Sequence, residues 1–160
     1  IDLPDSVKSL YWKTFKDCAS LKQITLPSGI KEIPSYFFDG CVSLEIIDLP
    51  SGGTKISEYS FRNCKSLVSV TFPATLKTID GNAFLNCSSL TEITLPDSLK
   101  TIDAWAFKGC TKLNRIRIPE SVTKINAKAF LNCKKLTICA PPESRAAKFA
   151  KTNKIPFIQE

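Results

Sequence analysis

Histidine is absent from this chain of 160 residues, and its absence removes much of the chemistry on which enzymes depend. Histidine is the commonest general base near neutral pH and the commonest metal ligand. The cysteines also lack the C-x2-C spacing that is typical of zinc sites. We therefore expect a non-enzymatic protein that uses no cofactor and binds no metal.

Methionine and long apolar runs are absent as well. A membrane helix needs roughly 20 consecutive apolar residues, whereas apolar runs in this sequence are only a few residues long, as in Ile46-Ile47. The first residues, Ile1-Asp2-Leu3-Pro4, have neither the basic start nor the apolar core of a signal peptide. We expect one soluble domain without a membrane span, processed or excised from a longer protein.

Acidic residues are the minority among the charged side chains. Lysine and arginine number 22 against 15 aspartates and glutamates, which gives a net charge of +7. This balance favours acidic partners without identifying one. A solvated, lysine-rich surface is the simpler interpretation.

What the sequence does contain is a repeat with a constant period of 23 residues. Its aromatic column holds Phe15, Phe38, Phe61, Phe84, Phe107 and Phe130. Its cysteine column holds Cys18, Cys41, Cys64, Cys87, Cys110 and Cys133. Its proline column holds Pro4, Pro27, Pro50, Pro73, Pro96, Pro119 and Pro142. Such a period predicts a repeat architecture in which each unit packs on its neighbours.

The sequence of each unit predicts a coil with a strand, a proline corner, a second strand or extended side, and a helical turn. In residues 90–96 the alternation of apolar and polar residues places Ile93 and Leu95 inward and indicates a short strand. Proline then ends the strand because it has no N–H for the ladder. Residues 98–102 predict a second short strand or an extended side, and residues 104–110 predict a helical turn with its apolar residues facing the core.

Two details of the repeat predict particular backbone features. Left-handed residues are expected to end each turn at Gly40, Asn63, Asn86, Gly109 and Asn132. Gly53 stands where the other units have a branched apolar residue. A local cavity or a rearranged backbone is expected there.

Stacking these units at ~4.8 Å per coil predicts a leucine-rich-repeat solenoid of the α/β class, with short strands and short helical turns. The coils should wind as a right-handed superhelix. Residues 1–142 are expected to form six coils with a truncated N-terminal edge, and that open edge suggests further repeats upstream. Residues 143–160 leave the frame, and their alanine-rich start predicts a C-terminal helical cap.

Cysteines make up 7 of the residues, and each is expected in a core slot. Six share one column, and Cys139 falls on the isoleucine column of the strand. Side chains stacked in parallel rarely meet the torsion that a disulfide requires. Buried free thiols that act as small apolar residues are the favoured interpretation.

The outward strand positions are the predicted binding surface, because stacking turns them into two lanes on a rigid sheet. One lane holds Gln23, Ile46, Ser69, Glu92 and Arg115, and the other holds Thr25, Asp48, Thr71, Thr94 and Arg117. Acidic and apolar character in the first coils gives way to arginine in the last coils, which suits a partner of mixed charge. The simpler alternative is that these are only solvated sheet residues.

A lysine column, Lys8, Lys31, Lys77 and Lys100, lies on another side of the coil. It could meet an acidic glycan or a nucleic acid. Surface aromatics interleaved with these lysines, and any known nucleic-acid module, are absent from the sequence, which argues against nucleic acid.

The unit from Leu90 to Cys110 fits the pattern L-x-x-I-x-L-P-x-S-L-x-x-I-x-x-x-A-F-x-x-C, which resembles the BspA-type leucine-rich repeats. The resemblance covers almost the whole chain, including an ending at residues 147–157 similar to the one that closes such arrays. It implies a secreted or cell-surface bacterial protein that serves in adhesion and protein binding, with a protein or extracellular-matrix ligand. Two alternatives remain open: a structural spacer or stalk, and a module that binds acidic glycans.

Overall fold

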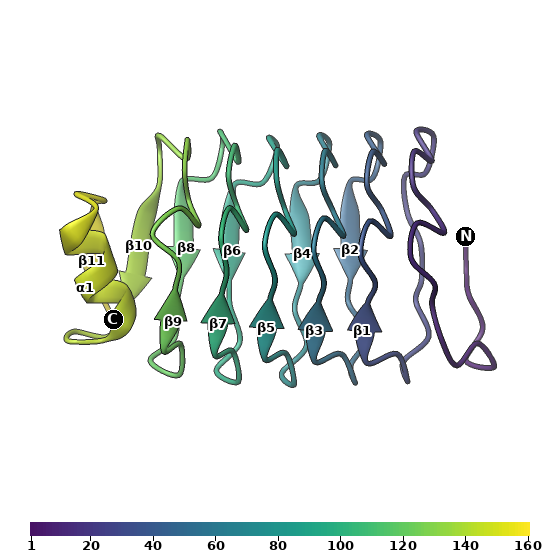
Figure 1. Cartoon of the computed structure of the whole chain (residues 1–160), viewed down its shortest axis with the longest axis horizontal. Helices are drawn as coiled ribbons and strands as arrows, with labels where there is room; N and C mark the ends of the chain where they lie inside the picture. Colours follow the sequence, from purple (N-terminus) through teal and green to yellow (C-terminus); the bar gives the residue numbers. More distant parts are fainter.

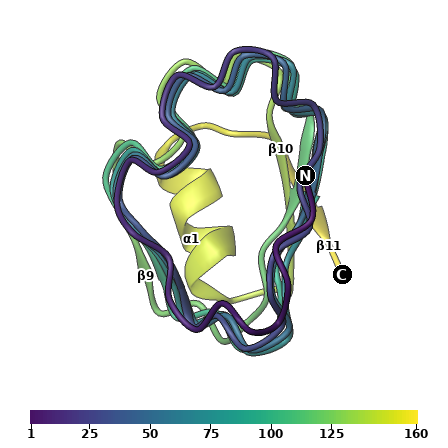
Figure 2. The ribbon, with the colours of Figure 1, turned by 90° about the vertical axis from the view of Figure 1, so that its right-hand side faces the viewer.

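The computed structural model describes all 160 residues as a solenoid of stacked coils with one helix at the C-terminal end. Figure 1 shows the coils side by side along the long axis, with the two chain ends at opposite ends of the stack. Viewed along that axis, the coils superpose on a common outline (Figure 2). The predicted repeat solenoid is therefore confirmed, and the 23-residue period is the step from one coil to the next.

Two parallel sheets form opposite sides of this outline. The first is five-stranded and contains β1 (Glu32–Ile33), β3 (Lys55–Ile56), β5 (Thr78–Ile79), β7 (Thr101–Ile102) and β9 (Lys124–Ile125). These strands arise from the segment that was predicted to be a second short strand or an extended side. Each pairs in register with the equivalent residues of the next coil, as Ile79 does with Ile102.

The second side carries the strands that end at the proline corners. They are β2 (Ile46–Asp48), β4 (Ser69–Thr71), β6 (Glu92–Thr94), β8 (Arg115–Arg117), β10 (Thr137–Ala140) and β11 (Phe157–Gln159). On this side, β2 pairs with β4 in a two-stranded sheet, and a four-stranded sheet follows in the order β6, β8, β10, β11. The hydrogen-bond ladder is interrupted between β4 and β6. The interruption coincides with Phe72, which is half-exposed where the neighbouring coils bury Leu49 and Leu95.

Apolar columns fill the space between the two sheets. The phenylalanine rings stack along the axis, with ring centroids 5.0 Å apart for Phe61 and Phe84 and 5.2 Å apart for Phe84 and Phe107. The planes of these rings are within 3° of parallel in the first pair and 2° in the second. Leucine and isoleucine columns surround them in a continuous core cluster. Each coil therefore completes its core only by contact with its neighbours.

The segment predicted as a helical turn forms successive turns and no helix. Within one coil, the N–H of Lys108 bonds to the carbonyl of Trp105, and the N–H of Cys110 bonds to that of Phe107. The N–H groups of Phe107 and Gly109, which alternate with these, donate to the next coil instead. Two residues of this segment, Trp105 and Gly109, are left-handed, with φ of 57° and 75°. The predicted inward positions of Phe107 and Cys110 are confirmed.

All five predicted left-handed residues have positive φ, from 60° at Asn63 to 78° at Gly40. A second left-handed column, which was not predicted, lies four residues before Asp17, Gly40, Asn63, Asn86 and Gly109. It consists of Lys13, Tyr36, Tyr59, Asn82 and Trp105. Left-handed tyrosine and tryptophan are uncommon. The N–H of Tyr36 donates to the carbonyl of Glu58 in the next coil, and the N–H of Tyr59 donates to that of Gly81.

Gly53 keeps the ordinary backbone of its column, so the expected rearrangement does not occur. Its N–H bonds to the carbonyl of Pro50 at 2.8 Å, and Ile30 and Leu76 make the same bond to their own prolines at 3.2 and 3.1 Å. The third coil keeps this bond and lacks an inward side chain at this position.

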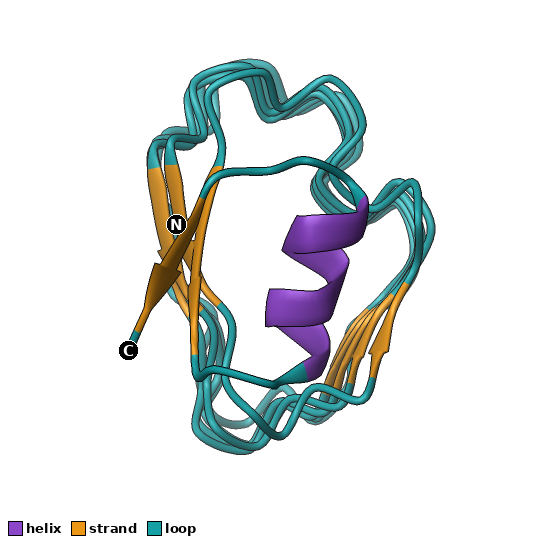
Figure 3. Cartoon of the chain, turned by 90° about the vertical axis from the view of Figure 1, so that its left-hand side faces the viewer, coloured by secondary structure: helices purple, strands orange, loops and turns teal.

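The C-terminal segment covers the last coil, as Figure 3 shows. Helix α1 (Arg145–Thr152) is capped at its N-terminus by Ser144, whose side chain accepts a hydrogen bond from the N–H of Ala147. The helix buries Ala146, Phe149 and Ala150. This confirms the predicted helical cap. No helix in the structure has the length and apolar composition that crossing a membrane requires.

One predicted position near the cap is wrong. Ile138, and not Cys139, continues the isoleucine column, because Ile138 pairs with Ile116 while Cys139 pairs with Arg117. The coil is one residue shorter before β10, which shifts the frame. Cys139 is nevertheless buried.

The cysteine column forms a ladder of thiols that bridge neighbouring coils. Each thiol from Cys41 to Cys133 donates to the carbonyl of the phenylalanine 26 residues earlier, at 3.0 to 3.3 Å. All seven cysteines are free, and only Cys18 is partly exposed. The thiols therefore act as small core residues that also join the coils.

Replacing Phe84 by alanine should strongly destabilise the solenoid. Phe84 is fully buried between two other rings, and removing such a ring costs about 3–5 kcal/mol. Urea unfolding followed by circular dichroism measures the change. Val68→Ala is the control, because Val68 is 45% exposed and surface truncations cost roughly 0.5 kcal/mol or less. Equal losses in both variants would contradict the proposed role of the ring stack.

The free energy of unfolding should fall as the pH rises above about 9. Burial raises the pKa of the Cys41 thiol from 9.0 to about 12, and burial also raises the pKa of Cys87 and of Cys110. The unfolded chain then loses thiol protons first, so this contribution to stability is complete below pH 9 and is lost towards pH 12.

Urea unfolding between pH 7 and pH 10.5 measures this dependence. Tyrosine and lysine titrate in the same range, so the comparison with Cys41→Ser, which keeps a hydroxyl donor at the same place, isolates the thiol. A slope that is identical in the two proteins would show that Cys41 does not contribute.

Candidate binding surface

The predicted binding surface, defined by the ten outward residues of the two lanes, lies on the side of the solenoid that carries β2, β4, β6 and β8. All of these side chains are exposed except that of Arg117, which is partly buried. The residues between them, such as Ile47 and Ile93, point into the core. The strand alternation thus presents both lanes to solvent and holds their backbone on a packed core. We call this side the ligand face.

The lane residues do not form one continuous sheet surface, because β2 pairs with β4 and β6 pairs with β8, but β4 does not pair with β6. Ile46 lies beside Ser69, and Glu92 lies beside Arg115. In the second coil, Thr25 is held by an isolated bridge to Asp2 of the first coil, and its hydroxyl donates to the Asp2 carboxylate at 2.6 Å. The interruption between β4 and β6 therefore divides the ligand face into an N-terminal and a C-terminal half.

The C-terminal half ends in an ion-pair cluster that the sequence did not predict. Arg117 donates from Nε to Glu160 at 2.9 Å and from Nη1 to Asp97 at 3.2 Å. Arg115 lies 3.9 Å from the same Glu160 carboxylate. The hydrogen bond that Arg117 donates to the Asp97 carboxylate is the main reason that the pKa of Arg117 lies above its usual value. The guanidinium of Arg117 therefore already donates hydrogen bonds within the chain, and Arg115 has only a longer ion pair and is more available to a partner.

The N-terminal half contains a shallow groove between the second and third coils. It has a volume of about 190 Å³ and is lined by residues of both lanes together with the corners that follow them. The lining includes Gln23, Thr25, Ile46 and Asp48. The side chain of Ile46 is 46% exposed beside it. An apolar side chain next to a carboxylate in a groove can bind an apolar or basic side chain of a partner.

The lysine column lies on another side, next to the first sheet. Lys8, Lys31, Lys77 and Lys100 are all exposed, and Thr54 interrupts them. Carboxylates lie on the same sheet, where Lys55 bonds to Asp80 at 3.1 Å and Lys124 lies 3.8 Å from Asp103. This side of the solenoid is therefore mixed in charge, which weakens the attraction of the column for a polyanion.

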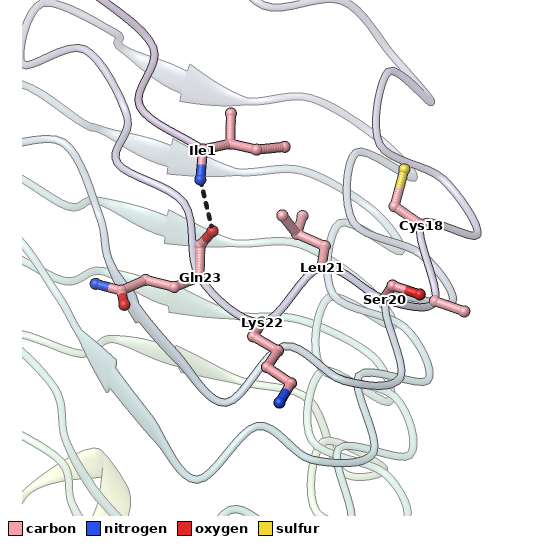
Figure 4. A pocket seen from close by; sticks show the side chains of 7 residues that line it. Ile1, Cys18, Ser20, Leu21, Lys22 and Gln23 are labelled. Carbon is pink, nitrogen blue, oxygen red and sulfur yellow. Dashed lines mark hydrogen bonds between the residues drawn. The ribbon is translucent and has the colours of Figure 1, made fainter.

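A second hollow, of about 670 Å³, lies at the first coil (Figure 4). It is lined by Ile1 and by residues 18–23. In Figure 4 the side chains of Ser20, Lys22 and Gln23 point in different directions, so its polar groups do not converge on one point. No group of three or more cysteine, aspartate or glutamate side chains has the arrangement of a metal site. Neither hollow holds a nucleophile paired with a base.

Two acidic residues that contact the ligand face, Asp97 and Glu160, were not predicted from the sequence. Glu160 lies outside the repeat frame, so no column could indicate that it reaches Arg117. Asp97 does belong to the frame, directly after Pro96, but its contact with Arg117 depends on how the corner folds. The exposure of the predicted lanes, in contrast, follows from the alternation alone.

Solved structures of bacterial repeat proteins are similar to this chain. A leucine-rich repeat protein of T. pallidum is 33% identical with a TM-score of 0.77, over 86% of this chain and 61% of that protein. A leucine-rich cell surface protein of Faecalibacterium prausnitzii is 34% identical with a TM-score of 0.71, over 77% of this chain and 32% of that protein. The pneumococcal vaccine antigen PcpA, 21% identical with a TM-score of 0.68 over 99% of this chain and 55% of that protein, shares the fold.

This chain therefore spans less than two thirds of the length of each of these proteins. None of the curated proteins compared with it matches. The family model described as the BspA type leucine rich repeat region matches in six copies, over residues 1–88 and 54–151. The chain belongs to the family of BspA-type leucine-rich-repeat proteins.

Proposed function

We propose that this chain is a non-enzymatic binding module of a bacterial surface protein, and that its ligand face binds a protein of the extracellular matrix or of a neighbouring cell. The observation that carries the proposal is the groove between the second and third coils, where Ile46 is 46% exposed beside Asp48. Buried strand residues hold these side chains on a rigid core. A preorganised surface loses little conformational entropy when a partner binds.

The charge distribution supports a protein partner over a uniform polyanion. The N-terminal half of the ligand face contains Asp48, and the C-terminal half contains Arg115. A partner of opposite charge order would be attracted along the length of the face and held in one direction. Exposed Ile46 adds an apolar contact of the kind that occurs in the cores of protein interfaces.

A place at the cell surface, or secretion, is part of the same proposal. The relative from Faecalibacterium prausnitzii is described as a cell surface protein. Adhesion is the role that best fits a rigid binding face on such a protein.

Two other functions are distinguished by experiment. In a spacer or stalk, the repeats would only separate other parts of a longer protein, and changes on the ligand face would leave attachment intact. Binding of acidic glycans would depend on the lysine column and would weaken in salt.

The test is capture of the purified chain by an array of extracellular-matrix proteins and acidic glycans at two salt concentrations. The face variant carries Ile46→Asp and Thr71→Arg, two exposed changes that leave the core and the ion pairs of Arg117 untouched. We expect this variant to lose at least about tenfold in affinity for a protein ligand, because a central apolar contact is replaced by a charge.

Lys100→Glu, on the other side of the solenoid, is the matched control and should bind as well as the unchanged chain. Binding that is lost in Lys100→Glu and retained in the face variant would exclude the ligand face as the site. A chain that captures nothing on the array would favour the spacer.

A further inference from the structure

The outermost strand of the second side has a free edge. β11 pairs with β10 through the N–H of Ile138, which donates to Pro156, and the N–H of Glu160, which donates to Ala140. In a parallel ladder, alternate residues direct their backbone groups to opposite sides. The N–H and carbonyl groups of Phe157 and Gln159 therefore point away from β10, where no other strand lies. Such an edge can accept hydrogen bonds from an added strand.

A groove runs between this edge and the cap helix. Its volume is about 610 Å³, and Phe157 and Gln159 line one side of it while Lys148 and Lys151 of α1 line the other. The two lysines lie three residues apart, on one face of the helix. Both are exposed and neither forms an ion pair. Glu143 is the one acidic residue in the lining, so the groove is basic.

The opposite side of β11 continues the ligand face. Ile158 pairs with Cys139, which pairs in turn with Arg117, so Ile158 lies on the outward side of the strand. Its side chain is 47% exposed, and that of Phe157 is 38% exposed on the groove side. The bond from Arg117 to Glu160 holds the strand at its end. The edge is thus fixed in an extended conformation and has apolar side chains on both sides.

We propose that the free edge of β11 binds an extended peptide segment in which acidic and apolar residues alternate. The segment pairs with the backbone groups of Phe157 and Gln159. Its acidic side chains, which point to the groove side, meet Lys148 and Lys151. Its apolar side chains, which point to the other side, lie beside Ile158. Successive side chains of a strand point to opposite faces. A peptide with alternating acidic and apolar residues therefore directs its acidic side chains to the groove and its apolar side chains to the side of Ile158.

This site is separate from the groove of the ligand face, which lies between the second and third coils, near the other end of the solenoid (Figure 1). The proposal therefore does not depend on the proposed function. The basic groove favours an acidic segment over a second copy of this chain, because two copies would bring their lysines together.

The probe for the test is a fluorescein-labelled seven-residue peptide of alternating valine and glutamate, and binding is followed by fluorescence anisotropy. The decisive variant is Gln159→Pro. It removes an N–H that faces the added strand and leaves the bonds to β10 in place, since proline is tolerated on an edge strand when its nitrogen faces solvent. We expect its affinity for the peptide to fall about tenfold or more.

Gln159→Val is the matched control, because it alters the same side chain and keeps the N–H. It should bind the peptide within about threefold of the unchanged chain. The double variant Lys148→Glu and Lys151→Glu tests the charge and should prefer a peptide of alternating valine and lysine. Both lysines are exposed on the helix, so this variant remains informative if the proline variant fails to fold.

Equal binding by the proline and valine variants would overturn the edge pairing. A lack of measurable binding to the glutamate peptide would overturn the proposal as a whole. Light scattering on the unchanged chain gives a further check, since a dimer that Gln159→Pro dissociates would assign the edge to a second copy of the chain. The Ile46→Asp and Thr71→Arg variant should bind the peptide normally, so failure of the ligand face and failure of this site are distinguishable.

Discussion

Two kinds of contact hold the coils of this protein together, ring stacking in the core and backbone hydrogen bonds between coils, and both recur once per coil. Phenylalanine rings stack along the axis, and the N–H groups that alternate with the turns of one coil bond to the next coil. Neither contact exists within an isolated coil. An insertion or deletion would displace the rings and the hydrogen bonds of that coil together, so the period and the fold depend on each other.

The sequence predicts those features that a single column determines. The inward strand residues, the left-handed Asn63 and Gly109, and the helix that begins after Ser144 are all visible as periodicity or as its loss. Features set by contacts between columns are not visible in this way. The left-handed Tyr36 donates its N–H to the carbonyl of Glu58 in the next coil, and the shifted frame at Cys139 is visible only in the pairing of Ile138 with Ile116 of β8.

In the candidate site, too, some features could be predicted from single columns and others depend on contacts between columns. The exposure of the two lanes follows from alternation, because an outward side chain has no column to join. The division of the ligand face at Phe72 and the engagement of Arg117 by Glu160 depend on the size and reach of particular side chains. Outward residues contact little of the core, so charge can vary from coil to coil at little cost in stability. The stack can therefore remain uniform while its outward charges differ between coils, as those of Asp48, Glu92 and Arg115 do.

The positions of the two chain ends have a mechanical consequence. They lie at opposite ends of the stack (Figure 1), so tension between them acts along the axis. Since each coil is held only by its neighbours, such tension can detach an end coil while the others stay folded. One released coil lengthens the chain by about 80 Å, at ~3.4 Å for each extended residue. A surface protein built in this way would lengthen in steps under shear flow and would keep the remaining coils, with their outward side chains, in place.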